Sequence, residues 1–150
     1  MNKLERLTEG FRTRWETFLT ACDAAEELGR WDTEADGQME AYYTEDLICI
    51  VLKLISADGS VSAEEARIVR ELFDFQYTPE ELRRVADELR EQIERLLAED
   101  VRAGLERLGA MDPRLEAMYR ELIGDACEIV SESDGLTVAE SEFLEQLRAL

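Results

Sequence analysis

The fold that we expect for this chain is decided by one stretch, Leu54-Ile-Ser-Ala-Asp58-Gly59-Ser-Val-Ser62-Ala-Glu-Glu65. Its pattern is repeated in Ile129-Val-Ser-Glu-Ser-Asp134-Gly135-Leu-Thr137-Val-Ala-Glu140. In each copy an apolar helical pattern runs into Asp-Gly, which favours a turn. A serine or threonine follows, and a glutamate three residues later completes a capping box that begins another helix. The repeat therefore predicts a pseudo-symmetric helical bundle.

The residues before the first Asp-Gly form the centre of the expected core. We expect this helix to begin at Thr44, because Glu45 and Asp46 would then lie in its first turn, where acids complement the helix dipole. Apolar residues then follow on almost every side: Leu47, Ile48, Cys49, Ile50, Val51, Leu52, Leu54, Ile55 and Ala57. A helix that is apolar all round belongs inside a core.

An N-terminal helix is expected over residues 3–29, where apolar side chains recur every three or four positions. They are Leu4, Leu7, Phe11, Trp15, Phe18, Cys22, Ala25 and Leu28. This single stripe predicts a helix that covers the core of its own chain, with a homodimer or partner interface as the alternative. Residues 30–43 are predicted to be a connector with a short helical turn. We therefore divide the chain into an N-terminal part, 1–43, and a helical domain, 44–150.

The remaining helices are predicted from capping signals and apolar periodicity. Thr78-Pro79 opens one that we extend to Leu97, and a shorter one carries Val101, Leu105 and Leu108. Another begins at Asp112-Pro113, and a last one places Phe143, Leu144 and Leu147 on the core. The expected architecture is all-α, a bundle of about six to eight helices.

The charge of the chain limits its partners. It carries 36 acidic and 17 basic residues, a formal net charge of −19. A protein that binds nucleic acid or an anionic membrane needs a basic surface, so neither is an expected partner of this acidic chain. Cations, basic proteins and neutral protein patches remain, although solubility alone also explains an acidic surface.

Histidine and cysteine usage excludes several kinds of chemistry. The chain has no histidine, which removes Ser-His-Asp and Cys-His catalysis and leaves oxygen ligands for any metal. Cys22, Cys49 and Cys127 are far apart, as expected for buried thiols in a reducing compartment. No signal peptide is visible, and the longest apolar run is interrupted by Lys53 and too short to span a bilayer. We expect a cytoplasmic protein without direct membrane insertion.

The two Asp-Gly corners resemble those of the TerB family, which is associated with tellurite resistance and is similar to a domain of certain membrane-anchored DnaJ co-chaperones. The resemblance covers residues 44–150, although the second corner is one residue shorter between its glycine and glutamate. It implies an all-helical fold, an acidic cluster that binds divalent metal, and a stress-response role in protein complexes associated with a membrane. Tellurite is an oxyanion, so a chain of this charge would act on it indirectly.

The candidate metal ligands lie at these corners: Asp58, Glu64, Glu65, Asp134, Glu140 and Glu142. Carboxylates and turn carbonyls suit Ca²⁺ or Mg²⁺. Turn formation and helix capping explain the same residues without a ligand, and partner binding without metal is a third reading. The first corner is not an EF-hand, because Leu54 and Ser56 occupy the first and third ligand positions. We expect a binding module and no enzyme, since the notable acids fall at capping positions.

Overall fold

The all-α class is confirmed by the computed structural model, which describes residues 2–55, 63–73, 78–133 and 138–150. Within these ranges the chain forms nine helical segments and no strand. The count exceeds the expected six to eight because two of the segments are short, α2 (Thr33–Asp36) and α6 (Arg90–Arg95).

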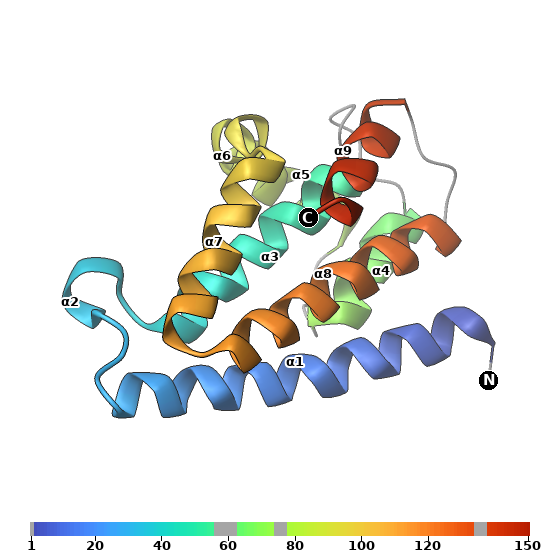
Figure 1. Ribbon diagram of the computed structural model, residues 1–150. Helices are drawn as coiled ribbons and strands as arrows, with labels where there is room; N and C mark the ends of the chain where they lie inside the picture. Colours follow the sequence, from blue (N-terminus) through green and yellow to red (C-terminus); the bar gives the residue numbers. More distant parts are fainter. Residues whose placement is uncertain (1, 56–62, 74–77, 134–137) are drawn as a thin grey trace.

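The bundle is built around α3 (Met39–Ile55), which lies between the other helices. The long α1 (Lys3–Glu27) and α8 (Pro113–Ser133) run antiparallel along one side of it, and α7 (Ala98–Met111) packs on α8 (Figure 1). The most extensive helix contacts in the described ranges are those of α8 with α1 and α7. These four helices supply most of the core.

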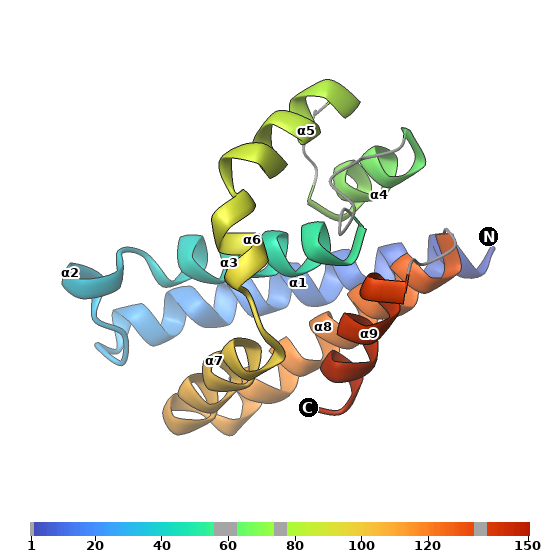
Figure 2. The ribbon, with the colours of Figure 1, turned by 90° about the horizontal axis from the view of Figure 1, so that it is seen from above.

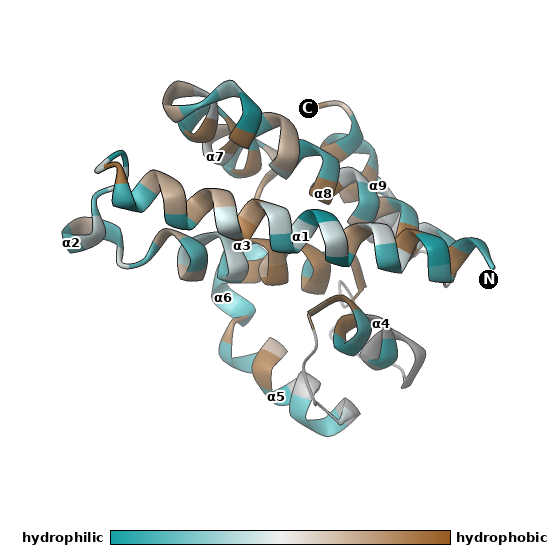
Figure 3. Cartoon of the chain, turned by 90° about the horizontal axis from the view of Figure 1, so that it is seen from below, coloured by the Kyte–Doolittle hydropathy of each residue, from teal (hydrophilic) through white to brown (hydrophobic). Residues whose placement is uncertain are grey.

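The other helices flank α3 on two opposite sides (Figure 2). On one side lie α4 (Ala63–Phe73) and α5 (Pro79–Glu88), and on the other α7 and α9 (Val138–Arg148). The view from below shows α1 crossing in front of α3 between these two groups (Figure 3). Around the second corner α8 and α9 pack on each other, while α3 packs mainly on α1, α6, α8 and α9. The pseudo-symmetry of the two corners stays a prediction.

The stripe on α1 is buried within the chain. Phe11, Phe18 and Cys22 are fully buried, and Trp15 is 8% exposed. Phe18 stacks on Tyr119 of α8, with ring centroids 5.2 Å apart. The side chains that we considered for a homodimer interface therefore contact the chain's own core.

The start of α3 differs from the prediction. The helix begins at Met39, not at Thr44, because its first amide has another partner: the Met39 N–H donates to the Glu26 carboxylate of α1 at 2.6 Å. Thr44 does not cap the helix, since its hydroxyl donates to the Glu40 carbonyl one turn earlier at 2.7 Å. A capping partner distant in sequence thus moves the boundary by five residues.

The predicted helix from Thr78 to Leu97 is divided in the structure. Thr78 caps α5 as expected, accepting from the Glu81 amide at 3.2 Å, but the helix ends at Glu88 and α6 follows. The Lys53 ammonium lies at the C-terminal end of α6. It donates to the backbone carbonyl oxygen of Ile93 at 3.2 Å and also to that of Leu96. Burial lowers the pKa of Lys53. A cation at this position favours the end of α6, because it complements the helix dipole.

The connector between α1 and α3 is attached to α7. It contains the short helical turn that we predicted, as α2. The Arg107 guanidinium lies 3.9 Å from the centroid of the Trp31 ring and donates to Asp36 at 2.5 Å. The Trp31 indole donates to the Gly37 carbonyl at 3.0 Å, and Gly37 has φ +72°, a conformation that favours glycine. These contacts fix the direction in which the chain enters α3.

The three cysteines are buried and unpaired, as expected. Burial raises the pKa of Cys22 to about 12 and that of Cys49 and Cys127 to about 11. Their thiols are thus held in the neutral form at pH 7, which suits a role in packing.

Candidate functional site

The predicted metal ligands fall mostly outside the described part of the chain. Asp58 and Asp134 lie outside the described residues. Glu64 and Glu65 belong to the start of α4 and Glu140 to the start of α9, but their side chains are also outside the described part. Glu142 is described and exposed on α9. Their arrangement around a cation therefore stays a prediction.

Among the described residues, no group of three or more aspartate, glutamate or cysteine side chains is arranged to hold a metal ion. This finding applies only to the side chains that the structure describes and does not extend to the two corners.

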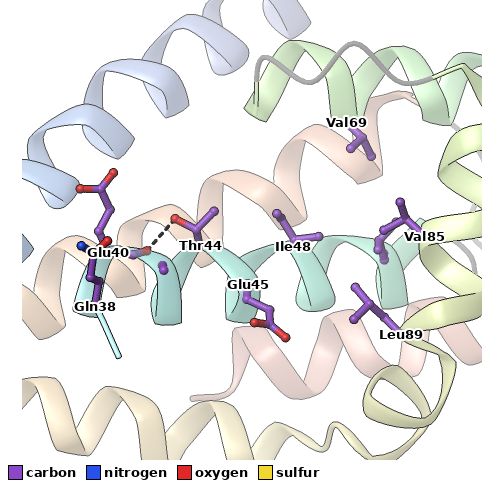
Figure 4. A pocket seen from close by; sticks show the side chains of 10 residues that line it. Gln38, Glu40, Thr44, Glu45, Ile48, Val69, Val85 and Leu89 are labelled. Atoms are coloured by element: carbon purple, nitrogen blue, oxygen red, sulfur yellow. Dashed lines mark hydrogen bonds between the residues drawn. The ribbon is translucent and has the colours of Figure 1, made fainter. Parts of the chain in front are cut away.

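One cavity in the described part of the chain is an open groove between α3, α4 and α5, which we call the α3–α5 groove. Its volume is about 330 Å³, a size at which protein cavities begin to hold ligands. In Figure 4, Thr44 and Ile48 face this space from α3, Val69 from α4, Val85 from α5, and Leu89 from the junction of α5 and α6. The remaining lining residues that the structure describes are Gln38, Glu40, Ala41, Glu45 and Leu52.

One half of the groove is apolar. Leu52 and Val69 form its floor and are only 1% exposed each. Ile48, Val85 and Leu89 form its walls and are half-buried, so part of each side chain meets solvent. Water contact with these apolar surfaces is unfavourable, at about 25 cal/mol per Å², and a bound apolar group would remove it.

The other half of the groove is acidic. Glu40 lies at this end, and its carboxylate turns towards α1 in Figure 4. Asp23 and Glu26 of α1 are its acidic neighbours. Burial, a hydrogen bond with Asp23, and the negative charges of Asp23 and Glu26 raise the pKa of Glu40. Like charges held together in this way favour binding of a proton or another cation. Glu26 has a structural task as well, since it caps the Met39 amide.

The described lining combines apolar side chains with two carboxylates, one amide and one hydroxyl. The Thr44 hydroxyl donates to the Glu40 backbone carbonyl of its own helix. Apolar walls next to carboxylates can hold a molecule that is itself apolar at one end and positively charged at the other.

The chain was compared with family models, curated proteins and solved structures. None of them matches it. The resemblance to the TerB family thus rests on the two corners in the sequence. In the described ranges, none of the helices combines the length and the apolar character needed to cross a membrane.

The α3–α5 groove was not predicted from the sequence. Residues 47–57 are apolar on all sides, and this pattern indicated a helix that the core surrounds completely. The structure leaves Ile48 half-buried, because α5 stands away from α3. A signal for the groove exists in the spacing of Thr44, Ile48 and Leu52, which places them on one face of α3.

Proposed function

We propose that the chain is a non-catalytic, acidic helical module that works by binding a segment of a protein partner in the α3–α5 groove. The observation that supports it is the groove itself, an open cavity with a buried apolar floor. Isolated apolar residues are common on protein surfaces, but a contiguous apolar groove with a polar rim is typical of an interaction site.

A photo-crosslinking amino acid at position 41 would test this proposal in the source cells. Ala41 is exposed and lines the groove, so a probe there leaves the core unchanged. Ala103, exposed on α7, is the matched control. We expect position 41 to crosslink to a defined second protein that position 103 does not reach. The same products from both positions, or none from either, would contradict the proposal.

The resemblance to the TerB family supports a second property, binding of Ca²⁺ or Mg²⁺ at the two Asp-Gly corners and a role in the response to tellurite and related stresses. The chain carries 19 more negative than positive charges, so divalent cations are attracted to it. In this proposal, cations bind at the corners, and the groove binds the partner, which can belong to a membrane-associated complex.

A titration with calcium and magnesium tests the cation site. At about 100 times the dissociation constant, a bound cation stabilises the fold by about 2.7 kcal/mol. For a chain of this size, that corresponds to a rise in melting temperature of roughly 5–10 °C. We expect calorimetry to show the same binding, and Asp58→Asn or Asp134→Asn to remove it, while the exposed control Glu106→Gln keeps it. Absence of both heat and stabilisation would end the cation proposal and leave the groove proposal standing.

A further inference from the structure

We infer that the segment bound in the α3–α5 groove is a basic amphipathic helix, whose apolar side chains enter the apolar half of the groove and whose lysine or arginine reaches the acids at its other end. This inference rests on the proposed function and adds the chemistry of the partner.

The shape of the groove favours a helix. Its described walls are helices, and the described part of the chain offers no strand edge with which an extended peptide could pair. From Glu40 to Leu52, α3 extends for about 18 Å, at 1.5 Å per residue. A partner helix of about three turns has the same length and can lie along it. Helices bound in grooves use apolar side chains at positions i, i+3 or i+4, and i+7.

The apolar half of the groove determines how many apolar side chains of the partner helix can bind in it. The half-buried Ile48, Val85 and Leu89 surround the floor residues Leu52 and Val69. Along α3 this patch runs from Ile48 to Leu52, about 6 Å or one turn of helix, which is enough for two aliphatic side chains of the partner at i and i+3 or i+4.

The charge of the groove favours a basic partner. Its described lining contains Glu40 and Glu45 and no basic residue. Asp23 and Glu26 stand behind Glu40 and add to the negative potential there. Arg84 of α5 is exposed but is not among the described lining residues. A second copy of this chain suits the groove less well, since both copies carry a net charge of −19 and repel each other.

The positions of the two halves predict the spacing in the partner. Glu40 precedes Ile48 by eight residues on the same helix, a distance of about 12 Å along its axis. A partner helix aligned with α3 therefore places one basic residue about seven or eight positions from the nearest apolar anchor, opposite Glu40. A second basic residue lies about one turn from that anchor, opposite Glu45, which precedes Ile48 by three residues. This spacing distinguishes it from an amphipathic helix with charges along its whole polar face.

Binding of designed peptides to the full chain tests the inference by fluorescence anisotropy. The probe is an alanine-based helical peptide of about 16 residues with leucines at i and i+4 and two lysines, one about one turn and the other about eight positions from the nearest leucine. A second peptide carries glutamates in place of the lysines, and a third carries the lysines next to the leucines. We expect the first to bind roughly tenfold more tightly than the second and several-fold more tightly than the third at low salt.

Variants of the chain separate the two halves of the groove. Ala41→Trp should fill the groove and weaken binding of the lysine peptide at least tenfold, while Ala103→Trp should not change it. Glu40→Gln with Glu45→Gln should reduce the preference for lysine over glutamate several-fold, and Glu106→Gln should keep it. The Ala41 and Glu40 variants alter exposed or half-buried positions, and circular dichroism would confirm that they are folded.

The possible results lead to different conclusions. Equal affinity for the lysine and glutamate peptides, still lost in Ala41→Trp, would overturn the basic partner and keep the groove as a protein-binding site. No binding of any peptide, or binding unaffected by Ala41→Trp, would overturn the inference and count against the proposed function too. Concentration-dependent dimerisation that Ala41→Trp abolishes would identify a second copy as the occupant and also overturn the basic helix.

Discussion

Replacing Phe18 by alanine is expected to lower the free energy of unfolding by about 3–5 kcal/mol, the range for removing a buried aromatic ring. Phe18 is fully buried, and its ring stacks on Tyr119 at 5.2 Å between centroids and meets Tyr43 edge-on at 5.9 Å. The substitution removes these contacts from the junction of α1, α3 and α8. Because these three helices form much of the core, the loss should destabilise the whole chain.

Urea denaturation followed by circular dichroism would measure this loss. Leu28→Ala is the matched control, since Leu28 is also on the apolar stripe predicted for residues 3–29 but is 69% exposed in the structure. We expect the control to change the free energy of unfolding by no more than about 0.5 kcal/mol. A loss below about 1 kcal/mol for Phe18→Ala would mean that α1 is separable from the rest of the fold, contrary to its buried position.

Periodicity predicted the parts of the fold that depend on local pattern. The centre of the apolar stripe of α1 is buried as expected, with Phe11, Phe18 and Cys22 inaccessible to solvent, whereas Leu28 lies beyond the end of α1 at Glu27 and is exposed. The helix that begins at Pro113 and the cap at Thr78 are confirmed as well. In these cases the residues that determine the structure are neighbours in sequence, so spacing alone identifies them.

The boundaries that were wrong depend on contacts between distant residues. The start of α3 was placed at Thr44 because acids follow it, but Glu26 of α1 caps the helix five residues earlier. The helix predicted to reach Leu97 ends at Arg95, where Lys53 of α3 meets the carbonyls of Ile93 and Leu96. Its break at Leu89 was missed because the apolar periodicity continues through that residue. A single sequence does not show which of its polar groups will meet across the fold.

The candidate site illustrates the same limit. Sequence motifs drew attention to the Asp-Gly corners, whereas the α3–α5 groove lies beside α3. Its residues come from three helices, and Val69 and Val85 have no pattern in common with Ile48 that a sequence could show. The acidic end arises because α1 brings Asp23 beside Glu40 of α3. Such a groove follows from the angle at which α5 leaves the bundle, which capping and periodicity do not determine.

Replacing Tyr119 by phenylalanine is expected to lower the free energy of unfolding by about 1–3 kcal/mol at pH 7, a large effect for the loss of one oxygen atom. Tyr119 is fully buried, and its hydroxyl donates to the Asp46 carboxylate, joining α8 to α3. Asp46 was predicted in the first turn of its helix but lies in the second, where it is half-buried. In the Tyr119→Phe variant, the Asp46 carboxylate would lose the hydroxyl that donates a hydrogen bond to it. Tyr42→Phe is the control, since that ring is 39% exposed, and we expect little change.

The loss of unfolding free energy in Tyr119→Phe should depend on pH, because Asp46 titrates. Burial raises the pKa of Asp46, and the hydrogen bond from Tyr119 opposes part of that rise. A carboxyl with a raised pKa in the folded chain destabilises it at high pH, and this penalty disappears as the pH falls through the folded pKa towards the ordinary value. Tyr119→Phe should raise the pKa of Asp46 further, so the cost of the substitution should shrink on acidification from pH 7. A cost that grows as the pH falls would contradict this account.

A double variant separates the loss of the hydrogen bond from the loss of packing. In an Asp46→Leu background the Tyr119 hydroxyl is buried without its carboxylate acceptor, so Tyr119→Phe should there be neutral or stabilising. Since the ring stays in both cases, the change of sign would assign the whole effect to the charged pair. If Tyr119→Phe were equally costly in both backgrounds, the hydroxyl would be stabilised by a group other than Asp46, and the pair would not be what joins α8 to α3.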